Sequence, residues 1–340
     1  MKKVSYLLVA LLMVLALAAC GNKASEKKSD QSGKNTIKIE SNYKVLGEKK
    51  DGSDAKKVSE TVEVPVNPKK VVTYDYAALT TLMDMEADKN IVGMPKGEND
   101  MSLPKFLEKY KDKKYENLGT LKEPNFEKLA EVNPELILIS GRTANQKVIS
   151  EMKKAAPDAT ILYVGTDDKD YIGSIKKNTE NLGKVFDKED KAKALNDALD
   201  KKIKEVKQMA DKSKDKGLFI LANEGELSVF GKGGRFGFIH DVLGVKEADT
   251  NIKAEGHGQV INFEYLNKKN PDIIFAMDRG VAVGGKSSSK KALSNDVIKN
   301  VSAIKANKII DLDPYLWYFS SGGASTTVKQ IEEVEKAYQK

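Results

Sequence analysis

The sequence predicts an α/β protein of two similar lobes, because an eighteen-residue pattern occurs in it twice. Residues 125–142 (NFEKLAEVNPELILISGR) recur 137 residues later as residues 262–279 (NFEYLNKKNPDIIFAMDR), with eight of eighteen positions identical and no gap. Each copy predicts a capped short helix, a break at Asn-Pro and a continuous apolar run followed by Arg. Such runs are typical of buried parallel strands, and ligands bind at the carboxyl ends of these strands.

Another interpretation of the repeat is a helix-to-strand joint that many α/β proteins share. Such a joint would account for the Asn-Pro break and for the apolar run. It accounts less easily for the shared Asn-Phe-Glu and for Arg142 and Arg279 at the same offset. We therefore expect duplicated lobes, each with an Arg that leaves the end of a core strand.

Composition limits the class of protein. A chain of 340 residues is long enough for two domains, and 40% hydrophobic with 31% charged residues describes a lysine-rich globular protein. The net charge of +7 is spread over many lysines, which favours an acidic ligand or a negatively charged surface; no DNA- or RNA-binding motif accompanies it. One cysteine excludes an internal disulfide, and two histidines exclude a histidine-rich metal site.

The N-terminus has the pattern of an export signal. Lys2 and Lys3 precede an apolar stretch, residues 7–17, that is short for a membrane span. Residues 17–20 (LAAC) then resemble the bacterial lipobox, which implies cleavage before Cys20 and a diacylglycerol on its thiol. An uncleaved signal anchor with an incidental cysteine is the alternative. The lipobox predicts a mature protein held outside the cytoplasmic membrane.

Local patterns predict the elements of the first lobe. Residues 21–35 are rich in Lys, Ser, Asp and Gly and predict a disordered tether. Alternation at residues 36–40 and 59–65 predicts the two strands of a hairpin. The further predicted elements are a turn and buried strand at 66–76, a helix at 77–85, a strand at 91–97 that carries Lys96 at its end, and a strand at 161–164.

The segment 169–212 has a helical pattern almost throughout and is predicted to connect the lobes. A second charged segment starts at Asp187, so a pair of surface helices is the alternative to a bridge. The second lobe should contain strands at 217–223, 227–230 and 308–312 and a helix from about Thr326. The predicted domains are a signal peptide at 1–19, the lipidated Cys with the tether and first hairpin strand at 20–58, an N-terminal lobe at 59–168, the connecting helix at 169–212 and a C-terminal lobe at 213–340.

Residues 280–287 (GVAVGGKS) match the phosphate-binding loop pattern GxxxxGK[ST] after a predicted strand. Three observations argue against an NTPase. Asp278 and Arg279 intervene, the residues that follow are a poor start for a helix, and only about fifty residues remain for the rest of such a core. An exported protein would also meet little ATP.

Three loops are candidates for a binding site. The glycine-rich loop 231–237 lacks the third glycine of a dinucleotide fingerprint, so we interpret it as a flexible loop that presents Arg235. His257 lies between glycines just before the second repeat copy, which makes it a site candidate. The aromatic residues at 315–319, with the only Trp, follow the last predicted strand and form either a core cluster or a binding wall.

Several short motifs together resemble the iron-siderophore substrate-binding lipoproteins of ABC transporters, closest to the catecholate and petrobactin binders of Gram-positive bacteria. The motifs are the lipobox, residues 64–72 (VPVNPKKVV), the two repeat copies, Arg235-Phe236-Gly237, His257-Gly258-Gln259 and Leu316-Trp317-Tyr318. The resemblance covers essentially all of the chain from about Thr36. It implies a class III binding-protein fold: two Rossmann-like lobes joined by a long helix, with a shallow cleft and little closure on binding.

The resemblance also implies a site in which basic residues of both lobes surround a ferric complex. By position these residues would be Lys96, Arg142, Arg235 and Arg279. A ferric tris-catecholate is a trianion with aromatic faces, and Arg can donate to catecholate oxygens, lie against rings and remain charged. Iron would arrive already chelated, so no intrinsic cofactor is expected. Trp317 would lie near the pocket.

Two further roles follow from the resemblance. In some relatives a His and a Tyr complete the iron shell when the siderophore offers only four donors, and His257 and Tyr318 match those places. An acidic residue on each lobe docks onto the permease, and Glu127 and Glu264 occupy equivalent positions in the two copies. The alternative for both Glu is charge complementarity with a helix N-terminus, worth only ~0.3 to 1 kcal/mol.

The sequence thus predicts a carrier that is anchored by lipid to the extracellular face of the cytoplasmic membrane, in a Gram-positive cell. It would capture a ferric siderophore of catecholate type and deliver it to an ABC permease dimer with its ATPase, as a monomer, without a reaction of its own and without nucleic acid. The same fold could instead bind haem, cobalamin or a hydroxamate siderophore. A remote alternative is a surface-anchored NTPase that uses residues 280–287.

Overall fold

A β-hairpin opens the part of the chain that the computed structural model describes, which comprises residues 35–49, 53–97, 103–167, 169–254, 256, 258–283 and 289–339. Strand β1 (Thr36–Val45) pairs antiparallel with β2 (Lys56–Pro65) over ten residues each. The hairpin predicted from the alternating residues is therefore confirmed, with strands longer than predicted. The predicted signal peptide, Cys20 and most of the tether lie outside the described residues.

The first sheet has five strands, all parallel, in the order β5-β4-β3-β6-β7. Its strands are β3 (Val71–Thr73), β4 (Ile91–Met94), β5 (Glu116–Asn117), β6 (Leu136–Ile139) and β7 (Thr160–Tyr163). The helices of this region are α2 (Tyr76–Asp84), η1 (Asp88–Asn90), η3 (Lys105–Lys111), α3 (Phe126–Val132) and α4 (Gln146–Ala155). Parallel strands joined by helices are the arrangement that the apolar runs predicted.

The second sheet is mixed, which the sequence did not predict. Its strands are β8 (Lys216–Asn223), β9 (Glu226–Phe230), β10 (Lys246–Glu247), β11 (Gln259–Ile261), β12 (Ile273–Asp278) and β13 (Ile309–Leu312). Their order is β11-β9-β8-β12-β13, with β10 paired to β8. The pairs β8–β9 and β9–β11 are antiparallel, because a two-residue turn at Glu224 and Gly225, both with positive φ, joins β8 directly to β9.

The helices of the second region are mostly short. They are α7 (Phe238–Asp241), α8 (Phe263–Lys269), α9 (Arg279–Ala282), α10 (Ser289–Ala292), η4 (Asp296–Ile298), α11 (Ser302–Lys305), α12 (Pro314–Phe319) and α13 (Ala324–Glu335). Among them α13 is twelve residues long and continues the chain past its last strand. The predicted C-terminal helix is therefore confirmed.

The two repeat copies fold alike. Asn125 and Asn262 cap helices α3 and α8, each of seven residues, by accepting a hydrogen bond from a backbone N–H three residues later. Both helices end at an Asn in the left-handed conformation, Asn133 with φ 46° and Asn270 with φ 45°. Each then leads into a buried parallel strand, β6 or β12. The predicted capped helix, break and core strand are thus confirmed in both copies.

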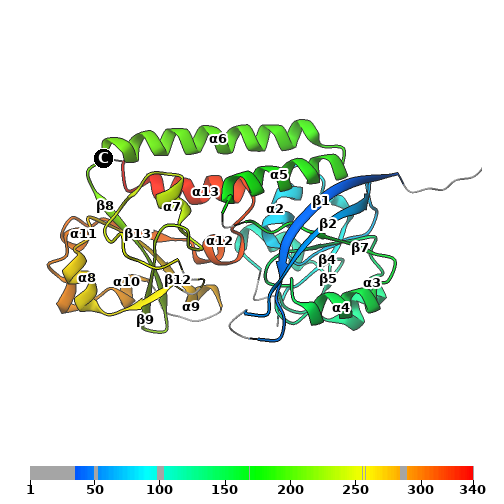
Figure 1. Ribbon diagram of the computed structural model, residues 1–340, viewed down its shortest axis with the longest axis horizontal. Helices are drawn as coiled ribbons and strands as arrows, with labels where there is room; N and C mark the ends of the chain where they lie inside the picture. The colour runs from blue at the N-terminus through cyan, green and yellow to red at the C-terminus, as the bar shows by residue number, and fades with distance from the viewer. Residues whose placement is uncertain are drawn as a thin grey trace, which may run out of the picture. The chain divides into compact units, whose positions relative to one another are not determined.

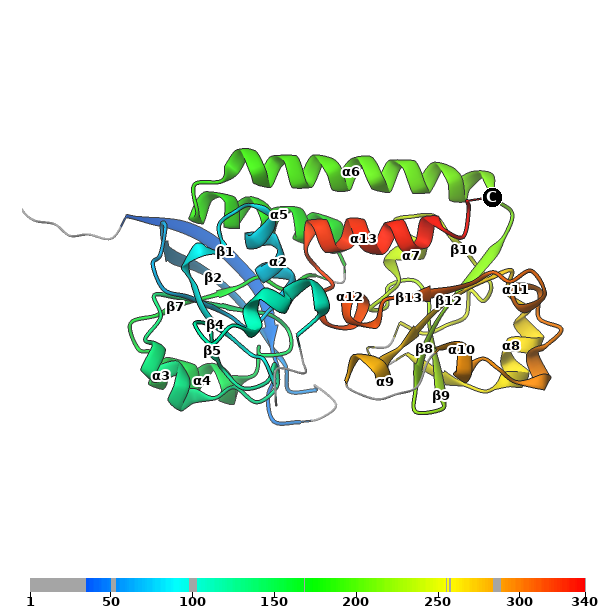
Figure 2. The same ribbon diagram turned by 180° about the vertical axis from the view of Figure 1, so that it is seen from behind.

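Both sheets are covered on both faces, which explains their continuous apolar strands. Along β12, Phe275 and Met277 pack in one hydrophobic cluster while Ile274 and Ala276 pack in another on the opposite face. Strand β6 divides in the same way, with Leu138 in one cluster and Ile137 in another. Figures 1 and 2 show helices α5, α6 and α13 together along one side of the two sheets.

Two helices, α5 (Tyr171–Val185) and α6 (Glu189–Lys212), occupy the segment predicted as a connecting helix. The break between them falls at Asp187, whose φ is 51°. Helix α6 spans both cores: Ala192 packs in the cluster of the first sheet and Leu199 in that of the second. Residues Thr36–Lys340 form one compact unit, so the boundaries predicted between the lobes within it remain predictions.

The chain returns from the second sheet to the first near its end. Phe319, the last residue of α12, packs edge-on against Tyr76 at the start of α2, with ring centroids 6.2 Å apart. Ser325 then donates a hydrogen bond to Asp84 at the end of the same helix. This return places Tyr318, the residue before Phe319, beside residues of both sheets.

Candidate ligand-binding site

The site is built at the carboxyl ends of the two central strands of each sheet. In the first sheet β3 and β6 are neighbours, and the chain leaves β3 toward β4 on the other side. Asp75 follows β3, and Arg142 lies in the turn between β6 and α4. Such a change of direction leaves a crevice at the strand ends, which is where open α/β sheets bind ligands.

The second sheet repeats this arrangement with different residues. Here β8 and β12 are neighbours, with Asp278 paired to Ala222. Asn223 is the last residue of β8, and Arg279 follows directly after β12. The register therefore sets Asn223 and Arg279 side by side, and Arg279 Nη1 donates to Asn223 Oδ1 at 2.7 Å.

Three arginines converge on Tyr318. Arg142 and Arg235 both donate through Nη2 to the backbone carbonyl oxygen of Tyr318, Arg235 at 2.9 Å. Arg279 Nε donates to the phenol oxygen of Tyr318 at 3.0 Å. The Cζ atoms of Arg142, Arg235 and Arg279 lie 4.6, 4.7 and 5.5 Å from the centre of the Tyr318 ring. One aromatic residue thus holds cations from both sheets.

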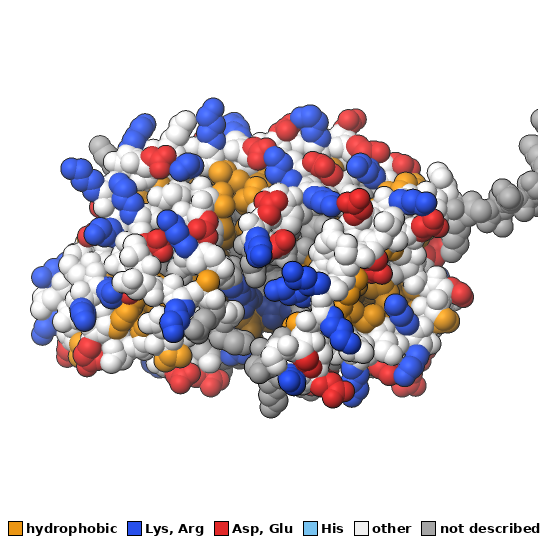
Figure 3. Space-filling view, in the orientation of Figure 1, with side chains coloured by type: hydrophobic (Ala, Val, Ile, Leu, Met, Phe, Trp, Pro, Cys, Tyr) orange, Lys and Arg blue, Asp and Glu red, His pale blue; other side chains and the backbone are white. Residues whose placement is uncertain are grey.

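These three are the only arginines in the chain, although it has 57 basic residues in total. Everywhere else the sequence uses lysine, so arginine is confined to this site. Arg offers several N–H donors in a planar, permanently charged group, which suits rings and oxyanions better than the ammonium group of Lys does. Figure 3 shows Lys and Arg side chains gathered at a hollow in the middle of one face of the molecule.

Within the described part of the chain, the three arginines donate to neutral acceptors: a backbone carbonyl, a phenol and an amide. Within the described residues none of the three has a carboxylate oxygen within 4.0 Å, whereas Lys269 and Lys308 do, at 2.8 and 2.6 Å. Burial and the nearby charge of Arg142 lower the pKa of Arg235 to about 10, and it stays protonated at neutral pH. The site therefore keeps its positive charge.

The positive charge of the arginines changes the pKa of Tyr318. The residue is 9% exposed. Burial raises its pKa, but the hydrogen bond from Arg279 and the charge of Arg142 outweigh burial and lower the pKa to about 8. The phenolate is thus more accessible at neutral pH than in an ordinary tyrosine. A phenol close to ionisation can act as a hydrogen-bond donor or, when deprotonated, as a ligand for ferric iron.

Asp75 is an acidic residue on which the charge of Arg142 acts. Burial raises its pKa, while the backbone N–H of Ala78, Ser140 and the charge of Arg142 act in the opposite direction. Its Oδ1 accepts from Ala78 N at 2.7 Å and caps α2. Asp75 therefore serves as a helix cap, and the charge of Arg142 acts on the pKa of its carboxyl without a direct ion pair.

The loop that carries Arg235 is a compact series of turns, and its predicted flexibility stays a prediction. Gly234 and Gly237 donate backbone hydrogen bonds back along the loop, and Gly233 N donates to Asp241 Oδ2 at 2.8 Å. A Cβ atom on Gly237 would lie 2.7 Å from the carbonyl oxygen of Gly231, so the close folding requires glycine there.

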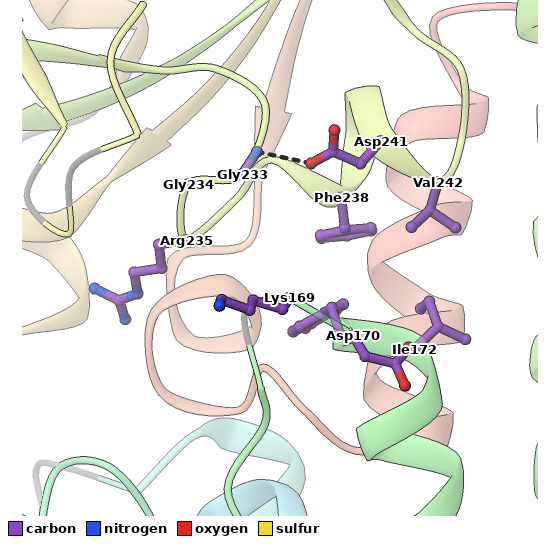
Figure 4. A pocket seen from close by; sticks show the side chains of 10 residues that line it. Lys169, Asp170, Ile172, Gly233, Gly234, Arg235, Phe238, Asp241 and Val242 are labelled. Carbon is purple, nitrogen blue, oxygen red and sulfur yellow. Dashed lines mark hydrogen bonds between the residues drawn. The ribbon is translucent and has the colours of Figure 1, made fainter. Parts of the chain in front are cut away.

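A cavity of about 570 Å³ adjoins Arg235. It is lined by the start of α5 (residues 169–172), by the loop at 233–235 and by α7 with the residue after it (238, 241 and 242). Figure 4 shows Arg235 at the edge of this group, with its guanidinium directed away from Asp241 and Val242. The cavity thus opens beside the arginine cluster and would give a bound ligand additional room.

Two predicted site residues lie elsewhere. Lys96 is 3% exposed, and its Nζ donates to the carbonyl oxygen of Asp112 at 3.0 Å, which ties it to the segment after η3. Trp317 is fully buried among Phe219, Phe236 and Phe238. Of the two interpretations of the aromatic residues at 315–319, Trp317 takes the core one, because its ring fills the core of the second sheet. Its neighbour Tyr318 and, at 5.0 Å from Arg235 Cζ, the ring of Phe236 contact the arginines.

The remaining predicted residues divide into two groups. Cys20 and His257 lie outside the described residues, so the structure does not place them. Glu127 and Glu264 are exposed, and each lies in the first turn of its helix, α3 or α8. Their equivalent placement agrees with the repeat; docking stays a prediction, with charge complementarity to the helix N-terminus as its alternative.

Sequence reasoning missed Asn223 and Asp75. Asn223 ended the strand predicted at 217–223, so the rule that selected Arg279, a polar residue at the end of a core strand, would have found it. Asp75 could have been found in the same way at the end of the first buried strand. The acceptor role of the Tyr318 carbonyl carries no sequence signal, because every residue has a carbonyl.

Other kinds of site are not supported in the described part of the chain. No group of three or more His, Cys, Asp or Glu there could hold a metal ion. No helix there is long and apolar enough to cross a membrane. In the phosphate-loop match, residues 280–282 form a helical turn in α9 directly after β12, whereas a phosphate-binding loop forms a concave nest in which successive backbone N–H groups converge on the phosphate.

Comparison with known proteins agrees with the fold. The family model described as periplasmic binding protein matches residues 71–316. The petrobactin-binding protein YclQ of Bacillus subtilis (strain 168) is 42% identical over 340 residues, which is all of both chains. The ferric-anguibactin-binding protein FatB of Vibrio anguillarum is 34% identical over 240 residues, 70% of this chain and 74% of FatB.

Solved structures give the same result. The crystal structure of YclQ has a TM-score of 0.79 and 42% identity, covering 90% of this chain and all of that one. The iron uptake ABC transporter substrate-binding protein PiuA from Streptococcus pneumoniae has a TM-score of 0.73 and 36% identity, covering 82% and 95%. The predicted class III binding-protein fold, with a long helix, is thereby confirmed. This chain belongs to the periplasmic binding protein family.

Proposed function

We propose that this protein is a carrier that captures a ferric siderophore and delivers it to an ABC importer for iron uptake. The observation that carries the proposal is the convergence of the only three arginines of the chain on Tyr318, Arg142 and Arg279 from the strand ends of the two sheets and Arg235 from the loop 231–237. Such a cluster binds an anion and performs no bond-breaking step by itself. The relatives are named for binding petrobactin or ferric anguibactin, or for iron uptake, which supports the same conclusion.

The chemistry of the site favours a catecholate-type ligand. A ferric tris-catecholate is a trianion, and its outer surface consists of catecholate oxygens and aromatic faces. Arg142, Arg235 and Arg279 can each donate to such oxygens or lie against such rings, as they now do with Tyr318. Charge-assisted hydrogen bonds contribute ~1.5 to 3 kcal/mol each, so three arginines are sufficient to decide between an anionic and a neutral ligand. Lys96 would contribute its charge from below the surface.

Tyr318 would meet the ligand first. Its phenol and carbonyl oxygens occupy the donors of the arginines, and a ligand with more oxygens and more charge would displace them. If the siderophore offers only four donors, the Tyr318 phenolate and His257 would complete the iron shell. The pKa of about 8 supports this role for Tyr318, because less free energy is needed to form the phenolate.

The proposal includes the place of the protein in the cell. Cys20 would carry the lipid that anchors the chain to the extracellular face of the cytoplasmic membrane in a Gram-positive bacterium. Glu127 and Glu264, both exposed and equivalently placed, would dock onto the two halves of the permease. The predicted monomer agrees with this arrangement, because one two-lobed carrier then presents one Glu to each half.

The alternative within the same fold is a carrier for haem, cobalamin or a hydroxamate siderophore. The arginine cluster favours a polyanion over these ligands; a neutral hydroxamate complex, for example, would leave three half-buried cations without counter-charge. An NTPase at residues 280–287 has less support, since the first part of that match is helical.

The proposal can be tested by titrating the purified protein with a ferric catecholate, a ferric hydroxamate, haem and iron-free catecholate. Binding is monitored by calorimetry and by the fluorescence of Trp317. We expect saturable binding of the ferric catecholate, weakened in Arg142→Ala and Arg279→Ala. Saturation by haem or the hydroxamate alone would keep the fold and overturn the ligand. Silence in the calorimeter with all four ligands would remove the siderophore proposal. Loss of ATP hydrolysis in Lys286→Ala would instead support the NTPase.

A further inference from the structure

Arg279 is held by two neutral oxygens. Its Nη1 donates to Asn223 Oδ1 at 2.7 Å, and its Nε donates to the phenol oxygen of Tyr318 at 3.0 Å. The two acceptors lie on different elements, the end of β8 and the end of α12. Together they fix the plane of the guanidinium, and neither brings a formal charge while the phenol is protonated.

Asn223 is itself held firmly. It ends β8, a strand hydrogen-bonded to β12 on one side and to β9 on the other. Its pair on β9 is Glu226, across the two-residue turn at Glu224 and Gly225. The sheet thus fixes the backbone of Asn223, from which its amide oxygen reaches Arg279 Nη1 at 2.7 Å.

An amide at this position differs from a carboxylate mainly in charge. Asp would accept the same hydrogen bond with nearly the same shape, and would pair with Arg279 as Asp249 pairs with Lys269 at 2.8 Å. Such a pair would cancel the charge that Arg279 offers a ligand. The lobe already uses a carboxylate one residue before Arg279, at Asp278, but as the cap of α9, where Oδ1 accepts from Val281 N at 3.3 Å.

From these observations we propose that Asn223 is a positioning residue that sets the charge selectivity of the site, because it orients Arg279 through a neutral oxygen and leaves the guanidinium charge for the ligand. This inference rests on the proposed function for the identity of the ligand. A charged oxygen in place of the Asn223 amide oxygen would change the preferred ligand from an anionic to a neutral ferric complex.

Two substitutions at position 223 separate the orientation of Arg279 from the charge of the group that accepts its hydrogen bond. Asn223→Ala removes the acceptor and should leave Arg279 poorly oriented. Asn223→Asp keeps the acceptor and adds a charge. Asn295→Asp is the matched control, because Asn295 is an exposed cap whose Oδ1 accepts from Val297 N at 2.9 Å and Asp caps equally well.

A measurement that needs no ligand is possible because the chain has three arginines. Protein labelled with ¹⁵N-arginine should give three side-chain Nε–Hε signals, assigned by Arg-to-Lys substitutions. We expect the Arg279 signal to be protected from exchange with water in the wild type, in Asn223→Asp and in Asn295→Asp. It should exchange faster in Asn223→Ala, because a guanidinium that has lost its Nη1 acceptor no longer holds Nε against the Tyr318 oxygen. Equal protection in Asn223→Ala and the wild type would overturn the positioning role, whether or not any siderophore binds.

Binding then tests the selectivity. Asn223→Asp should lose ~10- to 100-fold in affinity for a trianionic ferric catecholate, which corresponds to the loss of one charge-assisted contact. It should keep its affinity for a neutral ferric hydroxamate within ~3-fold. Asn295→Asp should match the wild type for both ligands. Equal losses for the two ligands in Asn223→Asp would overturn the charge part of the proposal, and failure of the wild type to bind either would count against the proposed function alone.

Discussion

The two repeat copies carry an Arg at the same offset, but they support it in different ways. Arg279 follows β12 immediately, and Asn223 on the neighbouring strand of the same sheet holds it. Arg142 lies in a turn three residues beyond the end of β6 and donates to the carbonyl of Tyr318, far along the chain. One arginine is thus fixed within its own sheet, whereas the other depends on the loop that carries it.

The loop of Arg142 has an external support. Leu46, at the end of the first hairpin strand, donates through its backbone N–H to Ala144 at 2.8 Å and accepts from Gln146 at 2.9 Å. Asn145 Nδ2 also donates to the carbonyl oxygen of Gly47 at 2.9 Å. The hairpin lies before residue 71, where the family match begins. The hairpin, which precedes the part of the chain that the family model matches, therefore braces the loop of Arg142.

The comparison teaches that a duplicated sequence fixes local structure but not its surroundings. The caps, the left-handed Asn and the core strand are repeated because they depend on residues within eighteen positions. The anchors of the two arginines are not repeated, because they come from other parts of the chain.

Docking should depend on both copies equally. The double charge reversal Glu127→Lys with Glu264→Lys should abolish siderophore uptake in cells, because both are exposed in the first turn of equivalent helices. The affinity for the ligand should stay within ~2-fold of the wild type, since neither Glu reaches the arginine cluster by any contact described above. Glu131→Lys, at the other end of α3, is the control. A large loss of affinity would contradict the docking role.

Removal of either Arg should weaken binding, and the loss should be greater for Arg279→Ala. We expect ~10- to 100-fold loss in affinity for a ferric catecholate in each variant, as for one charge-assisted contact. Arg279→Ala also leaves the Asn223 amide and the Tyr318 phenol without their donor, whereas the Tyr318 carbonyl keeps Arg235 in Arg142→Ala. Calorimetric titration measures both; a larger loss in Arg142→Ala would reverse the comparison.

The brace on the Arg142 loop should have a smaller effect. Leu46→Pro removes the N–H that donates to Ala144, and Leu46→Ala keeps it and serves as the control. We expect Leu46→Pro to lower the affinity ~3- to 10-fold, about the value of one neutral hydrogen bond, and Leu46→Ala to have little effect. In the ¹⁵N-arginine spectrum only the Arg142 signal should change. A shift of the Arg279 signal instead would show that the hairpin acts on the whole site.

Much of this structure could be predicted from the sequence, for reasons that the residues make plain. The helices capped by Asn125 and Asn262 and the strands that follow depend on local rules, so they were predicted in both copies. The antiparallel β8–β9 pair was not, because a two-residue turn at Glu224-Gly225 was not recognised between two apolar runs. A sequence pattern also could not separate Trp317 from Tyr318, which are adjacent but lie in the core and in the site.

The partners of the site were the least predictable part. The arginines were predicted individually, but nothing local indicates that all three meet at one residue. That convergence depends on the return of the chain through α12, which brings Phe319 against Tyr76. The burial of Lys96 is also a tertiary property, since its sequence context at the end of a strand resembles that of the arginines.

Tyr318, which Arg142 and Arg279 both contact, should give the smallest effect, a change in the pH dependence of the free energy of unfolding. This change measures directly how differently the two arginines are held. The pKa of Tyr318 is about 8 in the folded protein, against an ordinary value of 10.0, so between about pH 8 and pH 10 the folded state has released a proton that the unfolded state still binds. The free energy of unfolding should therefore rise with pH in this window, relative to Tyr318→Phe, and this contribution should vanish as the pH falls below about 8.

Arg279, which donates to the phenol of Tyr318, should control the width of this pH window. Arg279 reaches the phenol oxygen itself, whereas Arg142 reaches the carbonyl, so Arg279→Ala should narrow the window more than Arg142→Ala does. Urea unfolding at a series of pH values measures the difference between each variant and its own Tyr318→Phe partner. Parallel curves for the wild type and Tyr318→Phe would mean that Tyr318 does not titrate there. If the pH window is narrower in Arg142→Ala than in Arg279→Ala, the charge of Arg142, and not the hydrogen bond from Arg279, sets the pKa of the Tyr318 phenol.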